Sequence, residues 1–188
     1  PGSVTHWTDV PLVPTTAFKL LPLVCGDPAA AQATFRTSGT TGLGDRGTHH
    51  VLDLALYHGS VLPNFRRHLL PEGGPVRILS MVPDAKLAPE SSLGHMMAVV
   101  MDAFGDGSGG VFADGDGRLE VDAFAAAVAD AASDGVPVLV AGTAFAFVHW
   151  IERAEERGLG VLLSEGSRVM ETGGFKGRSR EVSRERLY

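Results

Sequence analysis

The sequence predicts an α/β fold in which a mainly parallel, doubly wound sheet is flanked by helices. Two short runs, residues 76–82 and 137–142, are almost wholly apolar and are bounded by glycine or proline, which is typical of strands covered on both faces. Longer segments with apolar residues at helical spacing lie between and around these runs, so strands and helices alternate. In such a fold, ligands gather at the carboxyl ends of the strands.

The first third of the chain is predicted to hold an arm, a strand and a helix. Residues 4–28 contain four prolines, which favours an extended arm with one or two helical turns that wraps a larger body. The domain prediction is therefore an arm over residues 1–28, with 1–3 as a possible cloning remnant, and an α/β nucleotide-binding domain or subdomain over residues 29–188. Residues 33–37 favour a strand, and residues 50–69 favour a helix that Pro63 kinks or divides.

The rest of the chain alternates regularly between the two kinds of element. Ser91 and Ser92 are candidate N-caps of a helix that closes at Gly105, and Gly158 ends a later helix. The remaining elements are predicted as strands at 76–82, near Val111, at 137–142 and at 168–171, and as helices at 121–132 and 145–157. Residues 112–123 resemble a calcium-binding loop, but Phe112 and Ala123 replace the first and last carboxylates, so a turn before a helix is expected.

Composition excludes several functional classes. The chain of 188 residues is 44% hydrophobic and 20% charged, as expected for a globular domain with a core. A formal net charge of −6 argues against a nucleic-acid partner, which requires a basic face. The lone cysteine, Cys25, excludes an internal disulfide and is expected to be a small buried residue. With no apolar run of about 20 residues, we expect a cytoplasmic protein without a membrane span.

The most informative stretch is TFRTSGTTG, residues 34–42, where a β-prone lead-in gives way to small, hydroxyl-bearing and glycine residues. Glycine tolerates positive φ and lets backbone N–H groups converge, while the hydroxyls add donors, so this turn is predicted to bind a polyphosphate. The phosphate-binding residues are predicted to be Thr37, Ser38, Gly39, Thr40, Thr41 and Gly42.

Two other glycine-rich motifs do not fit this turn. No lysine follows the glycines, so it is not the phosphate loop of nucleoside triphosphatases. Residues 42–47 match G-x-G-x-x-G, but the acid at the end of the following strand-like run, Asp84, comes too late for a dinucleotide fingerprint. A plain surface connection remains the alternative.

The stretch SGTTG after a strand resembles the phosphate-binding motif of the adenylate-forming superfamily, and further stretches resemble LuxE-like acyl-protein synthetases along nearly the whole chain. These further stretches are VPTTAFK (13–19), FRRHLLP (65–71), PESSLGHMM (89–97) and ETGGFKGRSREVSRERLY (171–188). The resemblance implies part of the large N-terminal domain of an enzyme that uses ATP and Mg²⁺. Its implied reaction activates a carboxylic acid, in the first place a fatty acid, through an acyl-adenylate and transfers the acyl group to a protein thiol. The alternatives are an acyl-CoA ligase of the phenylacetate type and a non-catalytic nucleotide-binding or interaction module.

The resemblance also implies site residues. It assigns adenosine binding to Gly173, Gly174 and Phe175, for which a plain strand-to-helix turn is the alternative. His95 is a candidate catalytic residue near the acyl pocket, against the alternative of a core histidine. Lys176 is a candidate catalytic residue that, with Arg178, would bind a phosphate or carboxylate. The alternative is that both residues belong to a solvated helix with mixed charges.

Two further expectations concern metals and partners. No HExxH or similar spacing occurs, so no protein-bound transition metal is predicted. In the family, a segment that stacks on adenine and holds Mg²⁺ would follow Tyr188, so the chain is expected to be either a fragment or a shortened relative. An exposed face is then expected beside Gly173, with self-association or association with the missing portion.

Overall fold

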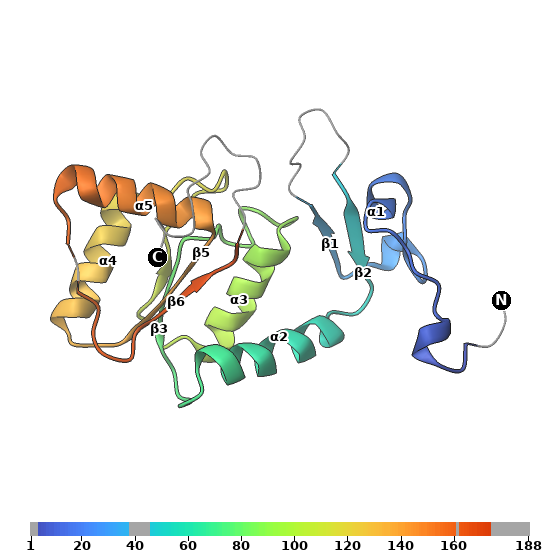
Figure 1. The fold of residues 1–188 in the computed structure, drawn as a ribbon, viewed down its shortest axis with the longest axis horizontal. Helices are drawn as coiled ribbons and strands as arrows, with labels where there is room; N and C mark the ends of the chain where they lie inside the picture. The colour runs from blue at the N-terminus through green and yellow to red at the C-terminus, as the bar shows by residue number, and fades with distance from the viewer. Residues whose placement is uncertain (1–3, 38–45, 161, 174–188) are drawn as a thin grey trace.

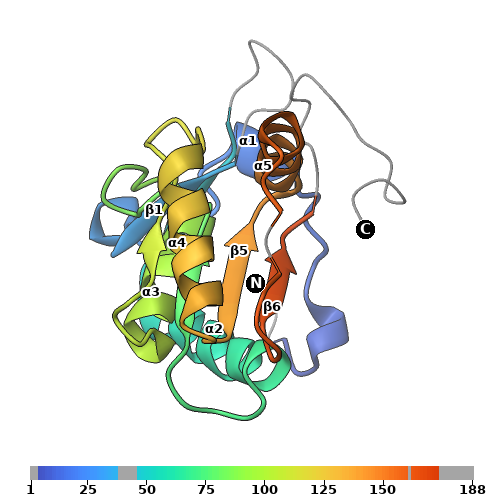
Figure 2. The same cartoon turned by 90° about the vertical axis from the view of Figure 1, so that its left-hand side faces the viewer.

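A four-stranded parallel sheet forms the centre of the protein in the computed structural model, which describes residues 4–37, 46–160 and 162–173. Its strands are β3 (Arg77–Ser80), β4 (Gly110–Val111), β5 (Val138–Gly142) and β6 (Arg168–Glu171), in the order β4-β3-β5-β6. Figure 2 shows β5 and β6 running side by side in the same direction. The predicted α/β class with a parallel sheet is confirmed, as are all four of these strands.

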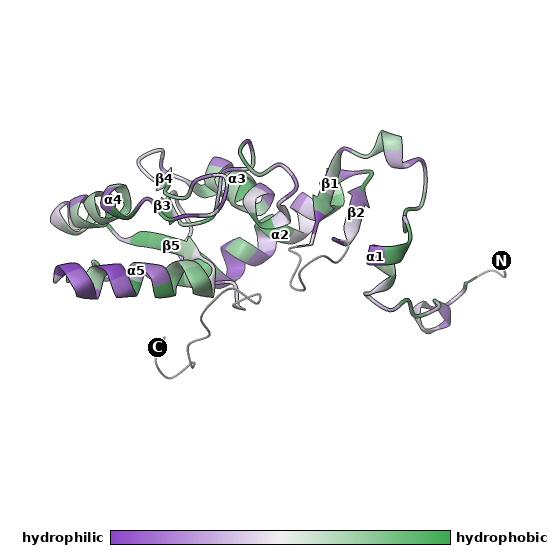
Figure 3. Ribbon diagram, turned by 90° about the horizontal axis from the view of Figure 1, so that it is seen from above, coloured by the Kyte–Doolittle hydropathy of each residue, from purple (hydrophilic) through white to green (hydrophobic). Residues whose placement is uncertain are grey.

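Helices cover both faces of this sheet (Figure 1). On one face, Ile78 and Leu139 pack with residues of α2 (Leu54–Leu69) and α3 (Ser92–Phe104). On the other face, Leu79 and Val140 pack with residues of α4 (Val121–Ser133), and α5 (Ala144–Arg157) covers the same side. All five residues of β5 are buried, and Figure 3 shows this strand as hydrophobic, because its alternating side chains enter two separate cores.

The helix ends follow their capping residues. The Ser91 hydroxyl accepts a hydrogen bond from the Gly94 amide, and the Thr143 hydroxyl accepts one from the Ala146 amide, so both act as N-caps. Gly158 ends α5 with φ 63°, a left-handed conformation that glycine adopts without strain. The turn before α4 is also confirmed, because an Asp114 carboxylate oxygen accepts hydrogen bonds from the amides of residues 116 and 118.

A separate antiparallel pair of strands precedes the main sheet. β1 (Ala33–Arg36) pairs with β2 (Thr48–Val51), and Phe35 lies opposite His49 in the register. The strand predicted at residues 33–37 therefore forms, in a sheet separate from the parallel one. The helix predicted from His50 is wrong at its start, because it begins at Leu54, after the N-cap Asp53. The hairpin formed by β1 and β2 is stabilised by pairing between distant residues, which a local periodicity does not report. α2 continues through Pro63 as one helix.

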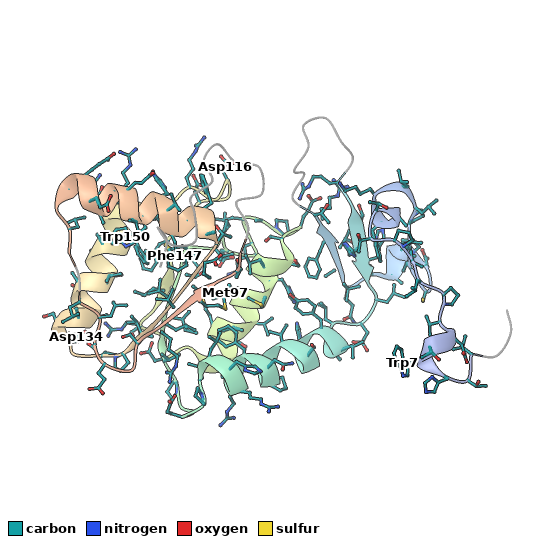
Figure 4. The ribbon with its side chains drawn as sticks, viewed as in Figure 1. Trp7, Met97, Asp116, Asp134, Phe147 and Trp150 are labelled. Atoms are coloured by element: carbon teal, nitrogen blue, oxygen red, sulfur yellow. The ribbon has the colours of Figure 1, made fainter. Side chains whose placement is uncertain are left out.

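The N-terminal arm is extended, with short helical turns, as predicted. It contains η1 (Trp7–Asp9), α1 (Ala17–Leu20) and η2 (Pro28–Ala30). The arm contacts the hairpin: the Phe18 ring stacks on His49 with centroids 4.3 Å apart. Further from this contact Leu12 is 99% exposed, and Trp7 (79% exposed) lies at the far end of the molecule in Figure 4. Cys25 is exposed, so the prediction of a buried cysteine is wrong.

No described helix is both long and apolar enough to cross a bilayer.

Candidate functional site

The two ends of the predicted phosphate-binding turn are closed by hydrogen bonds. The Thr37 amide donates to the Gly47 carbonyl over 2.8 Å, and the Gly47 amide donates to the Thr37 hydroxyl over 2.9 Å. Arg46 Nε donates to the Thr37 carbonyl over 2.8 Å. Ser38, Gly39, Thr40, Thr41 and Gly42 lie outside the described residues, so their phosphate contacts stay a prediction. Thr37 lies at the base of the turn, where its hydroxyl orders the backbone.

Glu90 fastens this base to the α/β body. Its carboxylate lies 3.3 Å from Arg36 Nε and 3.1 Å from Arg46 Nη1, and its carbonyl accepts from the Arg36 amide over 2.9 Å. Glu90 belongs to the connection between β3 and α3. Both ends of the turn are therefore held at the carboxyl end of β3, although β1 is not a strand of the parallel sheet.

The end of β6 lies at the same edge of the sheet. The Thr172 amide donates to the Gly142 carbonyl over 3.1 Å, which keeps the chain beside β5 after β6 ends. Gly173 follows with φ 74°, and its amide contacts the Glu171 carboxylate. The predicted adenosine residue Gly173 is thus at the carboxyl edge. Gly174, Phe175, Lys176 and Arg178 lie outside the described residues.

His95 belongs to a cluster of four rings, which we call the aromatic cluster: Phe35, Tyr57, His58 and His95. Its Nε2 atom lies 3.0 Å from Nε2 of His58. Phe35, only 5% exposed, packs on His95 and on Tyr57 with centroid distances of 5.4 and 5.7 Å. The Tyr57 hydroxyl donates to the Ser92 carbonyl over 2.9 Å. His95 is therefore half-buried with a polar partner, at the junction of β1, α2 and α3.

Burial and charge set the protonation of this cluster. Desolvation lowers the pKa of His95 below its usual 6.5, and the neighbouring His58 lowers it further. Burial raises the pKa of the Tyr57 hydroxyl. At neutral pH, His95 is therefore mainly a neutral imidazole and Tyr57 a neutral phenol, so these two groups offer hydrogen bonds without a charge.

The sequence alone does not identify two important members of this site. His58 lies 37 residues before His95, and Glu90 lies 44 residues after Arg46. No spacing rule joins such pairs, because the packing of α2 on α3 and the docking of the hairpin bring them together. The nearest signal is the position of His58 in the tyrosine-containing helix that follows the turn.

An apolar groove of about 790 Å³ lies along the open edge of the sheet. It runs between α5 and β6, and its lining includes Phe147, Trp150, Leu159, Leu163, Val169 and Glu171. Figure 4 shows Phe147 and Trp150 on the side of α5 that faces the sheet. Val169 is 54% exposed on the edge strand. The groove reaches Glu171, two residues before Gly173, and the expected association at this face stays a prediction.

Comparison of the chain with protein-family models, curated proteins and solved structures found no match. Among the residues that the structure describes, no group of three or more His, Cys, Asp or Glu side chains is arranged to hold a metal ion. Functional inference for this chain therefore rests on its residues and their geometry.

Proposed function

We propose that the protein belongs to an enzyme that activates a carboxylic acid, in the first place a fatty acid, with ATP and transfers the acyl group to a thiol. The observation that carries this proposal is the attachment of the turn base to Glu90. It fixes Arg36 and Arg46, which flank the glycine- and hydroxyl-rich stretch in the sequence, beside the connection that follows β3, and doubly wound sheets bind nucleotides at the carboxyl ends of their strands. The LuxE-like motifs quoted above support the same reaction.

In the proposed reaction, the substrate carboxylate attacks the α-phosphorus of ATP and pyrophosphate leaves. Negative charge moves toward the β- and γ-phosphates, and the hydroxyls of Ser38, Thr40 and Thr41 with the turn amides are positioned by sequence to stabilise it. Mg²⁺ bound to ATP would neutralise part of that charge, and we assign it no ligand among the described side chains. A thiol then attacks the acyl carbonyl and AMP leaves.

The edge holds two further groups with roles in this proposal. The backbone after β6, at Gly173, is free of a side chain and is assigned to the adenosine. His95 is the candidate contact for the acid, because a neutral imidazole carries an N–H group that can donate a hydrogen bond to a carboxylate. These groups do not identify the acyl acceptor, which is either a protein thiol or a small carrier. An acyl-CoA ligase is therefore included in the proposal.

A second function is favoured by the apolar groove. Val169 is 54% exposed on β6, which lies at the edge of the sheet among the described strands, and Leu162, in the connection before it, is 91% exposed; such surfaces mark interaction sites. A nucleotide-binding module that associates through this edge, without catalysis, is therefore the second candidate.

Exchange of radiolabelled pyrophosphate into ATP tests the first proposal. The full-length protein is assayed with Mg²⁺ and a panel of fatty and aromatic acids, and we expect exchange that depends on the acid. The double variant Thr40→Ala, Thr41→Ala should reduce the exchange at least about tenfold, since each lost hydrogen bond to a charged group contributes on the order of 1.5–3 kcal/mol. Thr8→Ala, in the exposed arm, is the matched control and should retain it.

The outcomes separate the candidates. Exchange followed by acyl transfer to a protein thiol, and not to coenzyme A, supports the acyl-protein synthetase reaction. ATP binding in titration calorimetry without exchange for any acid would favour the module without catalysis. If neither ATP binding nor exchange is found, the assignment of the turn to phosphates is wrong.

A further inference from the structure

The two imidazoles of the aromatic cluster meet through their nitrogens. The Nε2 atoms of His58 and His95 are 3.0 Å apart, whereas the ring centroids are 5.3 Å apart and the ring planes differ by 14°. If the two rings were stacked face to face, the distance between their centroids would be similar to the distance between their nitrogens. In this pair the nitrogens instead lie between the rings and point at each other, which is the geometry of an N–H···N hydrogen bond.

This geometry limits the number of protons that the pair can hold. A hydrogen bond between two Nε2 atoms requires one N–H group and one lone pair. The pair can therefore be neutral or carry one positive charge, because one ring always keeps its lone pair. A second charge would place two N–H groups and two positive charges against each other at 3.0 Å, and the pair would have to separate.

The surroundings do not compensate a second charge. Among the described residues, the rings that contact His95 belong to Phe35, Tyr57 and His58, and none carries a negative charge at neutral pH. The acidic groups that flank α2 and α3 have other partners: Asp53 accepts from the Ala55 amide, and Glu90 pairs with two arginines. The lowered pKa of His95 has the same physical origin.

The pair is linked to the hairpin through Phe35. This residue is buried against His95 and Tyr57, and it lies two residues before Thr37, where the turn base begins. Movement of the His95 ring away from His58 therefore displaces the surface on which Phe35 packs.

We infer that His58 and His95 form a proton-sharing pair that holds the hairpin, and with it the base of the glycine-rich turn, on the α/β body, and that a second proton releases it. The device is a regulatory one that adds pH dependence to the site. It does not depend on the chemistry proposed above, because its consequences are measured on the protein without nucleotide.

Nitrogen-15 NMR of the histidine rings in the full chain tests the hydrogen bond directly. At pH 8, one of the two Nε2 atoms should be protonated and the other should carry a lone pair. Finding both Nε2 atoms in the same state would overturn the inference, and this measurement needs no variant.

Hydrogen exchange tests the release. We follow the amides of residues 33–36 and 48–51, corrected for the intrinsic pH dependence of exchange and referred to the amides of β5. The hydrogen-bonded pair of α2 and α3 takes up a second proton less readily than two separated histidines. The state with the hairpin undocked therefore binds more protons, and docking weakens as the pH falls below about 6.5. We therefore expect hairpin protection to fall by more than about twofold between pH 8 and pH 5.

Variants show whether the pH-dependent loss of hairpin protection comes from the His58–His95 pair. His58→Gln places a neutral amide opposite His95, so two charges never meet, and the pH-dependent loss of protection should shrink to less than about twofold. The same variant keeps His49 and His50 of the hairpin, which contact Phe18 and Thr34. His68→Gln, an exposed position in the same helix, is the matched control and should behave as wild type. Equal pH dependence in His58→Gln and wild type would refute the inference.

Discussion

Replacing Phe35 by alanine should detach the hairpin while leaving the parallel sheet folded. Phe35 is the one fully buried side chain among the described residues of the hairpin, 5% exposed, and it packs on Tyr57 and His95. Loss of a buried phenylalanine costs about 3–5 kcal/mol in protein cores. Since both partners are half-buried, we take the lower end, about 3 kcal/mol, which raises the opening of the hairpin by about a hundredfold.

Native-state hydrogen exchange measures this change. The amides of β1 and β2 should exchange about a hundredfold faster in Phe35→Ala, and those of β5 should change by less than about threefold, because β5 belongs to a different sheet with its own cores. Phe35→Leu, which keeps most of the apolar volume, is the control and should cost under about 1.5 kcal/mol. Equal loss of protection in β5, or unchanged protection in the hairpin, would refute the reasoning that Phe35 anchors the hairpin as a separate unit.

Three further substitutions test the site and the fold. Glu90→Gln should lower the free energy of unfolding by under about 1 kcal/mol, because both of its ion pairs are over 40% exposed, yet calorimetry should show several-fold weaker ATP binding if the turn base positions the nucleotide. Gly109→Ala should destabilise by about 3 kcal/mol in urea unfolding, since its Cβ would lie 2.1 Å from a carbonyl oxygen of β3, whereas Gly160→Ala, in open space, should be nearly neutral. Gly59→Ala should raise the stability by about 0.5–1 kcal/mol, because this α2 position has free space for a methyl group and alanine favours the helix; an unchanged melting temperature would contradict this.

The elements of the parallel sheet could be predicted because their signals are local. Residues 138–142 are apolar at every position, and only a strand covered on both faces buries all of them. Ser91 and Gly158 mark helix ends through their own chemistry, a hydroxyl that accepts from a backbone amide and a residue without Cβ. These features need no knowledge of distant partners.

The hairpin was missed because its signal is not local. Residues 48–51 form a strand only by pairing with residues 33–36, and four residues are too few for a period of two to outweigh the helical pattern that follows. The same pairing moves β1 out of the parallel sheet. The strand predicted before the turn is present, and its partner strand was not predicted.

The sequence by itself determined the α/β class, the buried strands and the helix ends, because composition, periodicity and capping chemistry act over a few residues. Only the tertiary structure decided that Glu90 joins both ends of the glycine-rich turn to the carboxyl edge, and that His58 meets His95 at 3.0 Å. Such contacts join residues far apart in the chain, and they exist because α2 packs on α3 and the hairpin docks through Phe35. Side-chain geometry of this kind follows from how the elements pack, which no local pattern encodes.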